Sequence, residues 1–267
     1  AETLAELKEV ADLCESAIKK GLGAENKKFA VRLLTSSLYQ RANRYQGQIF
    51  GRNRNRRGVT PEQLNDLRTA ALKDLNRLLK HNKTYANAYL SIARLNAVRG
   101  GDRKKAVAAA TKAIELLKDD KTRRVDALVV RSQVSTNERQ QLADLNEAVK
   151  LAPNNQRVWQ ARFQFYVTKR RYDDAATDLK KLIKANPTND RMKLALAELL
   201  GNAKKYDDAF KVVDELIKRK PKSLEAYQMR SRINQRKNDL PAAIKDLSNA
   251  LKVRPNHIGT ILMRGGL

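Results

Sequence analysis

The chain has 267 residues, of which 42% are hydrophobic and only 5% aromatic, and its 55 Lys and Arg against 29 Asp and Glu give a formal net charge of +26. No stretch approaches 18 consecutive apolar residues, so we expect no transmembrane helix. The start lacks the basic, apolar and small-residue run of a signal peptide, and because Ala1 stands where methionine is usual, we expect a processed or truncated N-terminus. These features leave the cell compartment open. A single cysteine excludes an internal disulfide.

The first 45 residues predict two helices. Residues 2–20 place apolar side chains at helical intervals, and Gly21 is a typical end signal. We interpret residues 1–24 as the second half of a repeat. A helix over 30–45 is expected to follow.

Residues 46–60 interrupt this pattern with an arginine-rich insertion that is longer than most connections in compact domains. Thr60 then predicts a helix N-terminus, because Pro61 suits the first helical turn and Gln63 can complete a capping box. We expect this helix to run to about residue 80.

The remainder of the chain is marked by one interval of 34 residues. Four of the six prolines are spaced by it, namely Pro153, Pro187, Pro221 and Pro255. The same residue types recur between them, at Tyr172 and Tyr206, at Ala175, Ala209 and Ala243, and at Leu182, Leu216 and Ala250.

The segment 156–189 shows what one interval contains. Trp159, Phe163, Tyr166 and Val167 fall on one face of a first helix, and a second apolar stripe begins at Ala175. A charged stretch between them indicates a turn, and Asn186-Pro187 ends the second helix, because proline cannot donate the next backbone bond. Such a pair cannot bury both stripes alone, so neighbouring pairs must stack into an elongated core.

These features resemble the tetratricopeptide repeat, with its early aromatic residue, its alanine in the second helix and its proline after it. The resemblance implies an all-α, right-handed superhelical solenoid of antiparallel helix pairs. We divide it into a half repeat (1–24), a repeat with the inserted basic loop 46–60 (25–85), the repeats 86–121, 122–155, 156–189, 190–223 and 224–257, and the start of a truncated repeat (258–267).

No residues suggest catalysis or a cofactor. His81 and His257 lie far apart in sequence, and no Cys or His pair has metal-ligand spacing. Cys14 lies on an apolar stripe, so we interpret it as a buried structural residue. Aspartate pairs at 173–174 and 207–208 could suggest acid–base carboxylates, but their recurrence in the first turn of successive helices is explained by the helix dipole. We therefore predict no enzyme within this segment.

The positive charge favours acidic partners, although much of it is also expected on any solvated surface. Arg123, Arg157 and Arg191 are spaced by 34, and in the family this part of the first helix faces a concave ligand groove. The resemblance thus implies an arginine ladder able to clamp carboxylates or phosphates. Pairing of each arginine with an acid of the neighbouring repeat is the alternative.

The same mapping places further side chains on or near the groove, namely Gln160, Gln164, Arg232, Gln235 and Arg236. The family's clamp for chaperone C-termini requires asparagines at set positions, which here hold Ala161, Gln164, Ala195 and Glu198. A chaperone tail is therefore disfavoured, while another acidic peptide is not.

The insertion contains four arginines among asparagines and glycines, Arg52, Arg54, Arg56 and Arg57. Such a segment is either an anion-binding arm or a basic loop kept in solvent by its charge. Our main hypothesis is a non-catalytic scaffold that holds an acidic segment of another protein, or of its own parent chain. The alternative is a nucleic-acid or polyanion binder that uses the basic surface and this loop.

Overall fold

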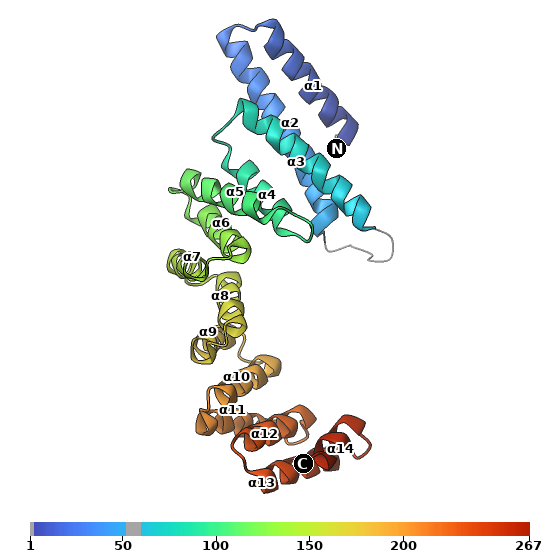
Figure 1. Cartoon of the computed structure of the whole chain (residues 1–267), viewed down its shortest axis with the longest axis vertical. Coiled ribbons are helices and arrows are strands. Elements are labelled where there is room, and N and C mark those ends of the chain that lie inside the picture. The colour runs from blue at the N-terminus through green and yellow to red at the C-terminus, as the bar shows by residue number, and fades with distance from the viewer. Residues whose placement is uncertain (1–2, 52–59) are drawn as a thin grey trace. The chain divides into compact units, whose positions relative to one another are not determined.

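The computed structural model describes residues 3–51 and 60–267 (Figure 1). Over these two ranges the chain forms fourteen α-helices and no β-strand, so the all-α prediction is confirmed. None of the helices described is long and apolar enough to cross a membrane. The chain divides into two compact units, Ala1–Pro153 and Asn154–Leu267, which we treat separately.

The first unit begins with three long helices and continues with two shorter hairpins (Figure 1). Its helices are α1 (Leu4–Lys20), α2 (Ala24–Phe50), α3 (Pro61–His81), α4 (Ala86–Ala97), α5 (Arg103–Leu116), α6 (Lys121–Val134) and α7 (Glu138–Leu151). Helix α2 packs against both α1 and α3, and the pairs α4–α5 and α6–α7 pack within themselves.

The second unit consists of three helix pairs and one more helix. Its first helices are α8 (Gln156–Thr168), α10 (Asp190–Asn202), α12 (Leu224–Arg236) and α14 (Ile258–Gly265), and its second helices are α9 (Tyr172–Ala185), α11 (Tyr206–Arg219) and α13 (Leu240–Val253). Each of the first three packs against the second helix that follows it, and α10 also contacts α9 and α12. Stacking of this kind buries the apolar stripes of both helices of a pair.

Helix α2 is longer than the sequence predicts. The expected range is 30–45, but the helix begins at Ala24 and continues to Phe50. Because Ile49 is buried in the core, the added turn contributes apolar contact, and the polar residues before it do not end the helix. The next helix begins as predicted, since Thr60 and Gln63 form a capping box and Pro61 lies in the first turn.

The recurring alanines of the second unit are core residues. Ala175, Ala209 and Ala243 are all fully buried. Their methyl groups let neighbouring helices approach closely, so a larger side chain at these positions is expected to force the helices apart. The turns that precede the first helices are closed by side-chain caps at the same interval, Asn155, Asn189, Ser223 and His257.

The turns inside the three pairs are also alike. Arg170, Lys204 and Asn238 have φ of 55°, 61° and 66°. Each donates its backbone N–H to a carbonyl three residues earlier, and the following residue donates to one five residues earlier. These two hydrogen bonds form a Schellman motif at the end of each first helix. Glycine adopts the positive φ of this motif most easily, because the Cβ of other residues clashes in the left-handed region.

The aromatic stripe of α8 is less buried than predicted. Tyr166 is buried, but Trp159, Phe163 and Val167 are only partly so, and Val158 fills the core instead. Arg162 explains part of this difference, because its guanidinium lies 5.0 Å from the centre of the Trp159 ring and 5.7 Å from that of Tyr166. A cation therefore covers aromatic surface that the sequence assigned to apolar packing.

Candidate ligand-binding groove

The predicted groove residues all lie on first helices of pairs. Arg123 lies on α6 in the first unit, and the others lie in the second unit, Arg157, Gln160 and Gln164 on α8, Arg191 on α10, and Arg232, Gln235 and Arg236 on α12. The three ladder arginines are thus divided between two units. We call the predicted groove residues of the second unit, on α8, α10 and α12, the first-helix face.

Arg123 is the ladder residue with intramolecular partners. Its Nε lies 2.6 Å from an Asp120 carboxylate oxygen, and its guanidinium also donates to Asn87 at 3.4 Å. Asp120 caps α6 by accepting the Arg123 backbone N–H, and this bond, with the guanidinium, lowers the pKa of the Asp120 carboxyl. Arg123 therefore pairs with the capping acid of its own helix.

Arg157 and Arg191 differ from Arg123. Both side chains are exposed, and within the described residues neither guanidinium has an ion-pair partner. Arg157 donates only its backbone N–H, to the capping side chain of Asn155 at 3.0 Å. A cation in the first turn of a helix opposes the dipole, so these two charges are not placed there for the stability of their own helices.

Arg191 borders a hollow of about 750 Å³ between the start of α10 and the turn from α11 to α12. Leu194 and Pro221 give it an apolar part, and Lys222 a second cation. Its remaining lining residues are Asp190, Lys220, Ser223 and Glu225. A hollow with an apolar wall and cations beside it suits a peptide segment that carries an acidic side chain.

Asp190 pairs with only one of the three cations that line this hollow. Its carboxylate binds Arg219 and accepts from Lys220 at 2.5 Å, and the Lys220 hydrogen bond is the main reason why the pKa of Asp190 is lowered. Lys220 is thereby occupied as well. Arg191 and Lys222 remain as cations, and Glu225 is the one acid of the lining that no ion pair neutralises within the described residues.

The other predicted residues are accessible to different degrees. Gln160, Gln164 and Arg232 are exposed. Gln235 is half-buried and donates to the Ser231 hydroxyl at 3.3 Å, while Arg236 lies 3.7 Å from Glu198 on the preceding first helix. Because the ion pair with Glu198 joins successive repeats, Arg236 is less available to a ligand than Arg232.

The predicted basic loop, Arg52, Arg54, Arg56 and Arg57, lies outside the described residues. Cys14 is buried, as predicted. The aspartates 173–174 and 207–208 occupy the first turns of α9 and α11, as their recurrence indicated. No group of three His, Cys, Asp or Glu in the described parts of the chain could hold a metal ion.

Comparison with known families decides what these helix pairs are. Two profiles of the tetratricopeptide repeat match within the second unit, one over residues 166–233 and one over 224–257. The chain contains tetratricopeptide repeats. The matched ranges cover the Schellman turns, the buried alanines and the hollow beside Arg191.

Solved structures of other proteins share the fold. YrrB, described as a TPR protein with an unusual peptide-binding site, has a TM-score of 0.53 and 16% identity over 72% of this chain and 97% of its own. A Naa15/Naa10 complex bound to HypK-THB has a TM-score of 0.59 and 16% identity over 87% of this chain, which spans a third (33%) of that longer chain. No curated protein sequence matches the chain. These similarities confirm an all-α solenoid.

Sequence analysis missed a set of arginine–aspartate pairs inside the repeats. Buried or nearly buried aspartates on second helices bind arginines of first helices through two oxygens, in Arg131–Asp144, Arg162–Asp178 and Arg230–Asp246. Arg41 and Asp74 form the same contact between α2 and α3. The signal was present, since Asp144, Asp178 and Asp246 are separated by one and two intervals of 34 residues.

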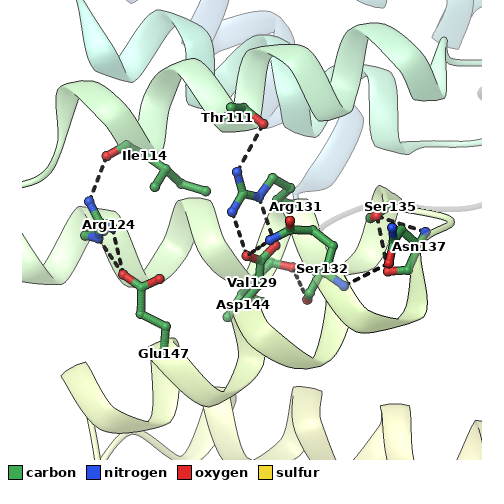
Figure 2. A network of polar contacts seen from close by, with 11 residues as sticks. Thr111, Ile114, Arg124, Val129, Arg131, Ser132, Ser135, Asn137, Asp144 and Glu147 are labelled. Atoms are coloured by element: carbon green, nitrogen blue, oxygen red, sulfur yellow. Dashed lines mark hydrogen bonds and ion pairs between the residues drawn. The ribbon is translucent and has the colours of Figure 1, made fainter.

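Figure 2 shows one of these pairs. Arg131 donates to Asp144 at 2.7 and 2.9 Å, and its remaining nitrogen reaches the Thr111 hydroxyl on α5 at 3.2 Å. Beside it, Arg124 binds Glu147 on α7 and the carbonyl of Ile114 on α5. These arginines join a helix pair to the preceding pair and are structural, so not every cation of this basic chain is available to a partner.

Proposed function

We propose that this chain is a non-catalytic interaction scaffold and that the first-helix face of its second unit holds an acidic segment of another protein or of its own parent chain. The observation that carries the proposal is Arg191, an exposed guanidinium without an ion pair, within the described residues, beside a hollow of about 750 Å³. Tetratricopeptide repeats build the face, and YrrB, which has the same fold, is described as having a peptide-binding site.

Charge favours an acidic ligand. Arg157, Arg191 and Arg232 are exposed without ion pairs within the described residues, and Lys222 adds a further cation beside the hollow. Arginine binds carboxylates through two parallel hydrogen bonds, which gives both affinity and a fixed orientation. Glu225 stands at the ladder position of the next repeat, so the acidic residues of a ligand are expected on α8 and α10 rather than on the start of α12.

The test compares acidic peptides with peptides in which Gln replaces every Glu. Fluorescence anisotropy with the full chain should show tighter binding of the acidic member of each pair. The variant Arg157→Glu/Arg191→Glu should lose this preference, with affinity falling about tenfold or more, as expected when one charge of a pair is reversed.

The matched control is Lys184→Glu/Lys218→Glu, which changes the net charge equally but alters the second helices. It should retain peptide binding. Equal losses in the two variants would mean that only overall charge matters, and unchanged binding after reversal of both arginines would refute the site.

A further inference from the structure

The second helices carry a set of lysines that neither the fold nor the first-helix face uses. Lys184, Lys218 and Lys252 recur at the 34-residue interval in the last turns of α9, α11 and α13. Lys180, Lys181 and Lys245 lie on the same helices. All six are exposed, and none has an ion-pair partner within the described residues. We call these six residues the lysine face.

The acids of these helices do not neutralise the lysine face, because they are bound elsewhere. Asp178 and Asp246 are buried under arginines of the first helices. Asp173, Asp174, Asp208, Asp214 and Glu215 each bind another Lys or Arg. Only Asp207 has no ion pair within the described residues, and it lies in the first turn of α11, away from the lysines near the helix end. The six positive charges are therefore uncompensated.

A last-turn lysine also complements the helix dipole, which accounts for Lys184, Lys218 and Lys252 individually. It does not account for Lys180 and Lys181, in the middle of α9, or for Lys245, one turn into α13. Lys245 and Lys252 are seven residues apart, about 10 Å along the helix axis, and so share one side of α13. The charges thus extend both along the helices and from repeat to repeat.

We propose that the lysine face binds the phosphodiester backbone of nucleic acid without reading its sequence. Lysine suits this role, because a flexible point charge can contact phosphates at many geometries and releases counterions on binding. A protein partner fits less well, since lysine is depleted from protein interfaces. A membrane also fits less well, because membrane-surface helices insert large apolar side chains between their lysines, whereas the exposed large apolar side chains of α9, α11 and α13 are only Leu240 and Ile244, both before Lys245 near the start of α13.

The experiment measures binding of the full chain to a fluorescein-labelled 20-base-pair DNA duplex by anisotropy at several salt concentrations. Affinity should fall steeply with salt. The variant Lys184→Glu/Lys218→Glu/Lys252→Glu should bind at least about tenfold more weakly at low salt. Its plot of log affinity against log salt should be shallower by about 0.9 for each phosphate that the variant no longer neutralises.

The matched control reverses three exposed lysines of the first unit, Lys27, Lys73 and Lys104, and so has the same net charge. It should bind the duplex close to wild type. A second variant with Gln at 184, 218 and 252 removes the charges without adding acids and should give an intermediate loss, while circular dichroism checks the fold.

Three results would overturn the proposal. One is an equal loss in the lysine-face variant and the first-unit control. Another is tighter binding to phosphatidylserine vesicles or to polyglutamate than to the duplex at matched charge concentration. The last is a loss in Arg157→Glu/Arg191→Glu as large as in the lysine-face variant, which would place the duplex on the other face.

Discussion

The two units use the same kinds of contact with different regularity. In the first unit α2 has 27 residues and α3 has 21, while the first and second helices of the complete pairs in the second unit have 13 and 14. Arg41 and Asp74 join α2 to α3 as Arg162 and Asp178 join α8 to α9. An arginine–aspartate pair can therefore join two helices whatever their lengths. The 34-residue interval is needed only where repeats of equal length stack on one another.

The largest effect is expected from removing the aspartate of a pair. In the first unit both side chains are nearly inaccessible, 8% exposed for Arg41 and 0% for Asp74. Asp74→Ala leaves a buried cation without a partner, which typically costs about 3–5 kcal/mol. Asp178→Ala should cost less, because Arg162 is 16% exposed and can turn toward water. Urea unfolding of the two variants measures the difference.

The control for this comparison is Arg41→Met/Asp74→Leu, which replaces the pair by apolar side chains of similar size. It should recover much of the stability that Asp74→Ala removes, because no charge is left buried. Equal destabilisation by Asp74→Ala and Asp178→Ala would show that burial does not distinguish the two pairs.

A smaller, local effect is expected where α1 joins α3. Arg77 on α3 binds Asp12 at 2.7 Å and Glu15 at 2.9 Å, both on α1. Cys14, which lies between these two acids in the sequence, is buried. Arg77→Ala should loosen α1 and expose the thiol, whose pKa burial now raises. Because Cys14 is the only cysteine, its rate of modification by a dithiopyridine reagent reports this opening directly.

The same contact predicts a response to acid. Hydrogen bonds from Arg77 are the main cause of the lowered pKa of both Asp12 and Glu15. A lowered folded-state pKa stabilises the protein above the ordinary carboxyl range near pH 4, and this contribution is lost as the pH falls through the lowered values. The Cys14 modification rate should therefore rise below about pH 4 in the wild type and change less in Arg77→Ala. A rate independent of pH in both would contradict this role for the two acids.

The smallest effect on the free energy of unfolding is expected at the turns inside the helix pairs. A substitution there should destabilise the first unit and slightly stabilise the second. Gly100 of the α4–α5 turn has φ of 80°, so Gly100→Ala should cost about 1 kcal/mol. Arg170→Gly relieves the corresponding strain in the second unit, but it also removes a cation near the end of α8 and makes the unfolded chain more flexible. The net gain should stay below about 1 kcal/mol. Thermal unfolding would refute this comparison if both substitutions destabilised equally.

The sequence by itself determined the repeat and much of its chemistry. The 34-residue interval of prolines and alanines predicted the helix pairs, because stacked units must present like residues at like positions. Thr60, Pro61 and Gln63 predicted the start of α3, because capping depends on residues within one turn. Local signals of this kind need no knowledge of the rest of the chain.

Only the tertiary structure decided which charges are available. Arg131, Arg162 and Arg230 bind buried aspartates of the following helix, whereas Arg157 and Arg191 have no ion pair in the described residues. The end of α2 at Phe50 likewise depended on the burial of Ile49, and the partial exposure of Trp159 on the position of Arg162. The physical reason is that pairing and burial are set by side chains distant in sequence or on neighbouring helices, whereas helical periodicity is set by residues within a few positions of one another.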